Sequence, residues 1–156
     1  MKKNIYCIIT VLLIIFICGC KSTNIEDIEN NIDDIKVQII NILELDSGTY
    51  YTLEVINNGK ELIKYVEVML GYSVTEDAKK EGITGPIMFQ GKTVDNAINL
   101  KSGEKKSFIV HVPVPLLKQE KIDMDRIQVC IQGYFSEVKI EKRFQKSGGL
   151  AIFNEE

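Results

Sequence analysis

The sequence is poor in the residues that build catalytic and disulfide-stabilised sites. Its 156 residues include no tryptophan, one histidine, three prolines and four cysteines. With His111 alone there is no HExxH metal motif, and neither a GxSxG nucleophile turn nor a phosphate-binding GxxxxGK[ST] loop occurs. Acidic residues outnumber basic ones, so we expect no nucleic-acid partner. We predict no catalytic residue, no metal ion and no cofactor, and therefore a protein that is not an enzyme.

What the sequence does contain begins with a positively charged start followed by an apolar run. Two lysines, Lys2 and Lys3, precede an apolar run from Ile5 to Ile17. A positive start, a short apolar run and a small residue before a cleavage point are the parts of a signal peptide. A membrane-spanning helix needs about twenty apolar residues. We therefore expect the apolar run to be removed rather than to remain as a transmembrane anchor.

The end of the run, Ile17-Cys18-Gly19-Cys20, resembles the lipobox of bacterial lipoproteins. The resemblance implies that residues 1–19 are a lipoprotein signal peptide and that Cys20 receives a diacylglyceryl thioether as the new N-terminus. Two acyl chains are enough for stable membrane anchoring. The expected location is the extracytoplasmic face of the cell membrane, with the lipid on Cys20 as the membrane contact. A plain secretory signal or an uncleaved anchor is the alternative.

The chain after the expected cleavage point is acidic and has one thiol. It has 137 residues, enough for one domain with a core, and 17 basic against 22 acidic side chains give a net charge of −5. Cys7 and Cys18 leave with the signal peptide and Cys20 is acylated, so only Cys130 remains. Without an internal disulfide, the stability of the domain must come from packing.

Residues 20–34 are expected to be an acidic linker or a short helix. Apolar residues are sparse, and five acidic residues gather between Glu26 and Asp34. Ile25, Ile28 and Ile32 nevertheless fall at helical spacing. In either case the acidic side chains are repelled by an anionic membrane surface, which would hold the following domain away from the bilayer.

From residue 35 to residue 146 the apolar period is two, which predicts an all-β domain. Short alternating runs recur about every ten residues with turn signals such as Asn57-Asn58-Gly59 between them. This pattern favours an antiparallel two-sheet sandwich of about seven or eight strands, immunoglobulin-like in the broad sense, with a small barrel as the alternative. Residues 147–156 are expected to be a loose C-terminal tail. The expected strands are Ile35–Leu45, Tyr51–Val55, Val66–Tyr72, Ile87–Gln90, Asn96–Leu100, Phe108–Val112, Ile127–Gln132 and Val138–Phe144.

The segment LEVINNGKELIKYVEVMLGYS, residues 53–73, resembles bacterial cell-surface sandwich domains of the FxLYM kind. Those domains combine an apolar strand, an Asn-Gly turn and a Val-x-Val-x-hydrophobic-x-Tyr strand. A later Gly-Glu turn before an apolar strand is matched by Gly103, Glu104 and Phe108. The resemblance implies an extracellular module and assigns no functional residue.

A few side chains could take part in chemistry. Cys130 and His111 would be the only plausible nucleophile and base of a thiol-dependent enzyme, provided that the fold brings them within hydrogen-bonding distance. Glu120, Asp123 and Asp125 could offer oxygen ligands to Ca²⁺, but the spacing lacks the glycine and the distal glutamate of a calcium loop. The tyrosines at 50, 51, 65, 72 and 134 could form a ligand-binding face or pack in the core.

The function that we expect is that of a lipid-anchored binding or accessory module, which recognises a protein, a peptide or an envelope polymer. The alternatives are the thiol-dependent enzyme and a purely structural surface spacer. The predicted binding residues lie in the loop 73–85, because loops on a rigid sandwich carry most recognition. They are Glu76, Asp77, Lys79, Lys80 and Glu81.

Strand counting predicts which loops face away from the membrane. If eight strands alternate up and down, the odd-numbered connections lie at the end opposite the start of the first strand. This set comprises Asp46–Thr49, Ser73–Gly85, Lys101–Lys106 and Tyr134–Glu137. The connection Pro113–Asp125 would then lie at the membrane-facing end.

Overall fold

The computed structural model describes residues 31–93, 98–114 and 120–153. The expected signal peptide, the expected lipobox with Cys20 and most of the expected linker lie outside the described residues. At the end of the linker region, Asn31–Asp33 are helical and Ile32 packs against the core. Within the described ranges, no helix combines the length and the apolar character that crossing a bilayer would require.

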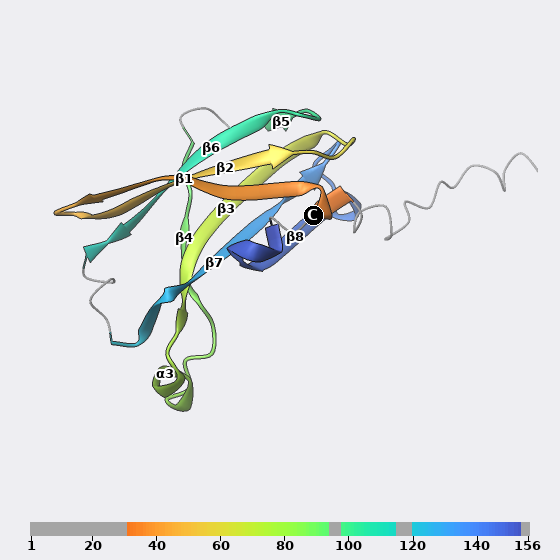
Figure 1. The fold of residues 1–156 in the computed structure, drawn as a ribbon. Coiled ribbons are helices and arrows are strands. Elements are labelled where there is room, and N and C mark those ends of the chain that lie inside the picture. Colours follow the sequence, from red (N-terminus) through yellow and green to blue (C-terminus); the bar gives the residue numbers. More distant parts are fainter. Residues whose placement is uncertain (1–30, 94–97, 115–119, 154–156) are drawn as a thin grey trace, which may run out of the picture.

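The described residues form an antiparallel sandwich of a three-stranded and a five-stranded sheet, which confirms the predicted fold class. One sheet has the order β1-β2-β6; the other has the order β4-β3-β7-β8, with β5 also paired to β3 (Figure 1). The strands are β1 (Ile35–Leu45), β2 (Gly48–Asn57), β3 (Ile63–Val74), β4 (Ile87–Gln90), β5 (Ile98–Leu100), β6 (Lys105–Pro113), β7 (Ile122–Phe135) and β8 (Arg143–Gly149). The helices that complete this list are α3 (Glu76–Lys80) and the 3-10 turns η1 (Ile140–Lys142) and η2 (Leu150–Phe153).

This strand order is that of an immunoglobulin-like sandwich. In such folds, strands A, B and E share one sheet while C, F and G share the other. Here β1, β2 and β6 take the first three places, and β3, β7 and β8 the second three. The strand β4 extends the second sheet beside β3, as C′ does in related sandwiches.

Burial follows the two-residue period where the sequence predicted it. Val66, Val68 and Leu70 on β3 are buried in the core, while Glu67 between them lies on the outer face. The same alternation holds for Phe108, Val110 and Val112 on β6, so His111 points outward as predicted. Because apolar surface is removed from water on the facing sides of both sheets, the core forms between them.

A buried asparagine fixes the turn between β2 and β3. The side-chain nitrogen of Asn57 donates to the carbonyl oxygens of Glu61 and Leu100, at 2.8 Å and 3.0 Å. Its side-chain oxygen accepts from the Gly59 amide at 3.1 Å. Asn57 therefore satisfies backbone groups that a sharp turn would otherwise leave without partners.

The first strand contains a register change that alternation alone did not predict. We expected Leu43 and Leu45 to share a face with Ile39, but a bulge between Ile39 and Asn41 shifts the pairing with β2. After the bulge, Leu43 lies opposite Tyr50, whose side chain is on the outer face. A one-residue shift moves every later side chain to the other face of the sheet.

The C-terminal part also differs from the sequence-based expectation. Val138 and Ile140 were expected to lie on the last strand, but their exposed fractions are 63 % and 70 %, and β8 begins only at Arg143. The expected loose tail is wrong for residues 147–153, since β8 continues to Gly149 and η2 buries Phe153. Local alternation does not reveal that a terminal phenylalanine closes the gap between the sheets beside β1.

The predicted assignment of loops to the two ends is wrong for every connection after β4. Both β4 and β5 run antiparallel to β3 along the same edge, so they act as one interrupted strand and the up-down count slips by one. Lys101–Lys106 and Tyr134–Glu137 therefore lie at the end where β1 starts, the near end. Two amide contacts place them there: Gly103 donates to the Asn57 carbonyl, and Ser136 donates to the Leu62 carbonyl.

The opposite end, which we call the far end, carries three connections. Two of them, Asp46–Thr49 and Ser73–Gly85, were predicted there. The third is Pro113–Asp125, whose two ends are held beside them: the Val114 amide donates to the Ser47 carbonyl, and the Thr75 amide donates to the Lys121 carbonyl. In Figure 1 the β1–β2 hairpin and α3 project from the body of the sandwich in different directions.

Candidate functional site

The most unusual feature of the far end is an exposed apolar strand. Four side chains of the outer half of β1 have exposed fractions near one half, namely Ile40 (49 %), Ile42 (53 %), Leu43 (48 %) and Leu45 (51 %). Because β1 is the terminal strand of its sheet, its outer edge is not paired with another strand among the residues that the structure describes. We call Ile40–Leu45 the open edge. Neighbouring apolar side chains in this number are typical of an interaction surface.

The two halves of β1 have different environments. Ile35 and Val37 are fully buried, and η2 packs beside this near half of the strand. After the bulge the strand leaves the body of the sandwich with β2 as its hairpin partner, and Figure 1 shows the tip standing clear of β3 and β7. Proteins usually protect free strand edges with lysine, proline or a covering element. The sequence IINILEL has no lysine or proline, and its one charge is Glu44.

Beside the open edge, the outer face of the three-stranded sheet carries an aromatic pair. Leu43, Tyr50 and His111 lie in one row across β1, β2 and β6. The Tyr50 and His111 rings stack with their centroids 4.4 Å apart, and His111 Nε2 lies 3.3 Å from the Ser47 carbonyl oxygen. A cavity of about 510 Å³ borders this pair, lined by Tyr50, Gln90, Lys92, Thr93, Ile109 and His111.

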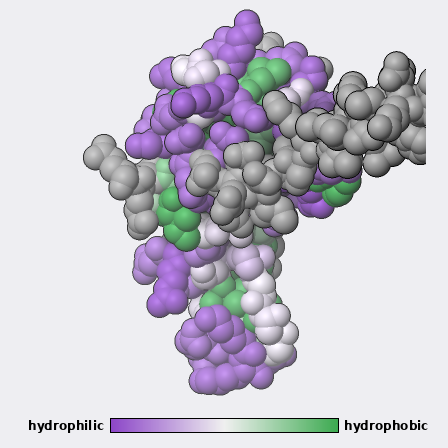
Figure 2. Space-filling view, turned by 90° about the vertical axis from the view of Figure 1, so that its right-hand side faces the viewer, coloured by the Kyte–Doolittle hydropathy of each residue, from purple (hydrophilic) through white to green (hydrophobic). Residues whose placement is uncertain are grey.

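The five residues predicted to bind a partner are found on and beside α3, also at the far end. Thr75 caps this helix by accepting from the Ala78 amide, and Ala78 is buried. The charges pair with one another: Lys79 with Glu76 at 2.6 Å, and Lys80 with Asp77 at 2.8 Å. The hydrogen bond from Lys79 lowers the pKa of Glu76. Glu81 pairs with Lys121. The helix forms the hydrophilic lower tip of the molecule in Figure 2.

The fold does not assemble the candidate thiol–imidazole pair. His111 lies on the outer face of the three-stranded sheet, whereas Cys130, between the buried Val129 and Ile131, lies on the outer side of the other sheet. The whole core separates the two side chains. Burial raises the pKa of the Cys130 thiol, which opposes formation of the nucleophilic thiolate.

The acidic turn before the seventh strand is occupied by local contacts. The expected loop to Asp125 is shorter than predicted, because β7 already begins at Ile122. Asp123 accepts from the Asp125 amide at 3.2 Å and pairs with Arg126 at 3.2 Å. Among the described residues, no group of three His, Cys, Asp or Glu side chains is arranged to hold a metal ion.

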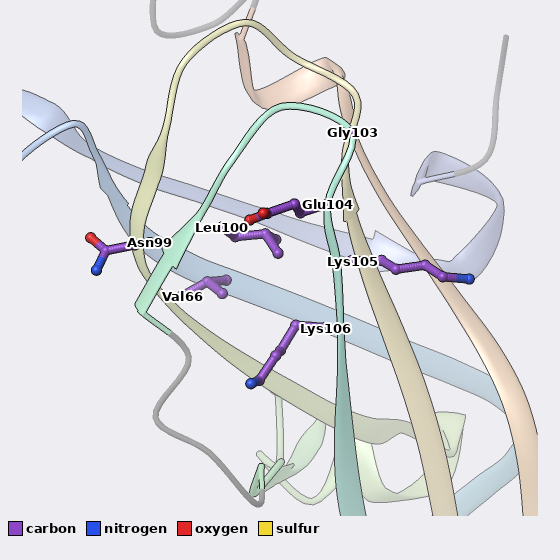
Figure 3. A pocket seen from close by; sticks show the side chains of 7 residues that line it. All are labelled: Val66, Asn99, Leu100, Gly103, Glu104, Lys105 and Lys106. Carbon is purple, nitrogen blue, oxygen red and sulfur yellow. The ribbon is translucent and has the colours of Figure 1, made fainter.

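A hollow at the near end offers little for recognition. It measures about 440 Å³, with Val66 and Leu100 inside the ring of lining residues in Figure 3. The Asn99 amide points away from this space and accepts from Lys64 at 2.8 Å. The Lys105 ammonium also points away and pairs with Glu54 at 3.1 Å. Two of the polar lining side chains are therefore turned away from the hollow, and a third, that of Glu104, already accepts from the Lys101 amide at 2.8 Å.

Comparisons with known proteins add no function: no family model matches the chain, and no curated protein matches it.

The sequence did not predict the far-end site, because alternation assigned Leu43 and Leu45 to the core. One signal was available, since IINILEL is apolar at odd and even positions and a half-buried strand should be apolar at only one of the two.

Proposed function

We propose that the protein is a lipid-anchored extracytoplasmic binding module that captures a protein partner through the open edge of β1. The observation that carries this proposal is the half exposure of four large aliphatic side chains on an unprotected edge strand. A domain that needed this strand only for its own stability would bury those side chains or interrupt them with charge.

The occupant that fits the open edge is an extended peptide segment of the partner. A peptide strand added beside β1 would satisfy its free backbone N–H and C=O groups, and this is the mode of recognition known as strand addition. The exposed aliphatic side chains lie on both faces of the hairpin, so the matching segment is apolar at consecutive positions, with side chains directed to both faces. Glu44 and Asp46 near the tip favour a segment with a basic residue at one end.

The expected anchor supports the same arrangement. If Cys20 carries the lipid, the chain enters the sandwich at the near end, where β1 begins. The open edge would then point away from the bilayer toward partners outside the cell. The charged residues of α3 lie at the same end and stay a predicted contact, although their mutual ion pairs make them a weaker attraction than unpaired charges would be.

The test is recovery of a partner by the full-length protein in its own membrane. A photo-crosslinking amino acid at Ile42 should give one discrete adduct, and Ile42→Lys should reduce recovery of that partner about tenfold, because a charge on the edge opposes strand addition. The matched control is Val138→Lys, at an aliphatic residue of the near end that is 63 % exposed against 53 % for Ile42. This control variant should recover as much of the partner as the unmodified protein does.

Two results would contradict the proposal. One is undiminished recovery by Ile42→Lys when the melting temperature is unchanged. The other is loss of recovery when residues 76–81 are replaced by a Gly/Ser stretch while Ile42→Lys binds normally, which would assign recognition to α3. An adduct of twice the protein's mass, without any other partner, would show that the open edge pairs with a second copy and would also refute the proposal.

A further inference from the structure

A second surface, on the outer face of the five-stranded sheet, has a different chemistry from the open edge. Tyr65 on β3 lies opposite Tyr134 on β7, which lies opposite Arg143 on β8. In the next row, Glu67 lies opposite Gln132. These five side chains and Gly133 line a hollow of about 330 Å³. We call the five side chains the Tyr65–Arg143 site.

The polar groups of this site hold one another in place. The Tyr65 hydroxyl donates to one carboxylate oxygen of Glu67 at 2.5 Å, and the Gln132 side-chain nitrogen donates to the other at 2.6 Å. Arg143 donates to the Gln132 side-chain oxygen at 3.5 Å. Side chains that are fixed before a ligand arrives lose less conformational freedom on binding.

The hydrogen bonds also fix which groups carry charge. The bonds from Tyr65 and Gln132 lower the pKa of Glu67, so this carboxylate is ionised at neutral pH. The same bond to Glu67 raises the pKa of Tyr65 to about 12, so its hydroxyl stays protonated. Within the described residues, Glu67 and Arg143 form no ion pair. The site therefore presents a carboxylate that keeps further lone pairs and a guanidinium that keeps further N–H donors beyond the bonds named above.

The mixture of groups restricts the class of ligand. A guanidinium has five N–H donors, a carboxylate only accepts, and the Tyr134 hydroxyl can do both. An anion would be repelled by Glu67 and a cation by Arg143. A ligand whose hydroxyl groups donate and accept in close alternation satisfies both kinds of partner. The two tyrosine rings, which stack on no other aromatic ring in the described ranges, add flat surfaces for the C–H face of a sugar.

We propose that the Tyr65–Arg143 site binds a neutral saccharide segment. The hollow is at the lower limit of small-ligand pockets, which suits one or two sugar rings rather than an enclosed ligand. An extended peptide is the poorer fit, because β3 and β7 are interior strands of the five-stranded sheet and not a free edge. This inference goes beyond the proposed capture of a protein partner and uses the opposite sheet, so either can fail without the other.

The experiment is a calorimetric titration of the full-length protein in a zwitterionic detergent without sugar headgroups. The probes are chitotetraose, cellotetraose and mannotetraose, with triglutamate and spermine as anionic and cationic controls. We expect saturable binding of at least one oligosaccharide with Kd below about 1 mM, and no saturable binding of either control. No binding of any of the three sugars at about 10 mM would overturn the proposal.

Variants locate the binding. Arg143→Ala and Tyr134→Ala should each weaken sugar binding about tenfold, while Arg126→Ala, an exposed arginine outside the site, should not change it. Glu67→Gln should retain binding within a few-fold, because the amide oxygen still accepts. Two results would overturn the assignment. One is sugar binding by Arg143→Ala that equals binding by the unmodified protein. The other is that Glu67→Gln binds triglutamate more tightly than it binds sugar. Ile42→Lys should leave sugar binding unchanged, which separates this site from the open edge.

Discussion

At the scale of single residues, two tyrosine hydroxyls join the sheets across the core. Tyr51 on β2 and Tyr72 on β3 are both buried, and their hydroxyl oxygens are 2.5 Å apart. Burial, with the hydrogen bond between Tyr72 and Tyr51 as a smaller cause, raises the pKa of Tyr72 well above its usual range. The unfolded chain would release this proton near pH 10 while the folded chain keeps it, so the contribution is present below pH 10 and is lost as the pH rises further.

This pair predicts a non-additive double-mutant cycle. Tyr72→Phe should lower the free energy of unfolding by about 1–3 kcal/mol, because the buried Tyr51 hydroxyl loses its partner. Tyr51→Phe should have a similar effect. The double variant should lose less than the sum of the two single variants, since no polar group is then left without a partner. Urea unfolding of all four proteins measures this, and simple additivity would show that the hydroxyl pair contributes nothing specific.

At the scale of elements, the C-terminal turn η2 packs against the hydrophobic core of the sandwich. Phe153 is buried beside β1 and β8, and the ammonium of Lys146 lies 5.5 Å from its ring centroid. Ile152, its neighbour in the same turn, is 44 % exposed. The turn therefore covers the near half of β1 and leaves the open edge uncovered.

Removing the buried side chain of Phe153 should destabilise the whole domain. We expect Phe153→Ala to lower the free energy of unfolding by about 3–5 kcal/mol, because it deletes a buried aromatic side chain and leaves a cavity. Ile152→Ala, the matched control in the same turn, should cost less than about 1 kcal/mol. Thermal unfolding of the two variants provides the measurement, and equal effects would mean that the C-terminal turn is as loose as the sequence suggested.

At the scale of the whole molecule, the two ends of the sandwich differ in chemistry. The near end holds the chain entry, the Asn57 turn and the connections at 101–106 and 134–137. The far end holds the apolar open edge and the charged helix α3. An anchor near residue 20 would give this difference a direction, because the far end would be the one presented to the surroundings.

The anchor itself is tested by a substitution outside the described residues. Cys20→Ala should release the protein from the membrane fraction or leave the uncleaved precursor, since the thioether cannot form. Cys18→Ala is the matched control and should remain membrane-bound at the mature size. Fractionation followed by mass determination distinguishes the outcomes. A Cys20→Ala protein that is still membrane-bound at the mature size would refute the lipobox prediction.

The sequence by itself determined the features that depend on local chemistry. The two-residue period placed Val68, Leu70, Val110 and their neighbours in the core, and the Asn57-Asn58-Gly59 signal located the turn between β2 and β3. It also located most of the strands and indicated the sandwich. These predictions succeed because facing and turn formation depend mainly on which neighbouring residues are apolar, polar or glycine.

Only the tertiary structure decided how the strands meet. The bulge after Ile39 depends on pairing with β2, and the parallel course of β4 and β5 depends on their sharing the edge of β3. The burial of Phe153 depends on a gap between two sheets that are formed by distant parts of the chain. The Tyr65–Arg143 site arises in the same way, because its side chains come together only when strands far apart in sequence pair side by side, and no local pattern encodes that juxtaposition.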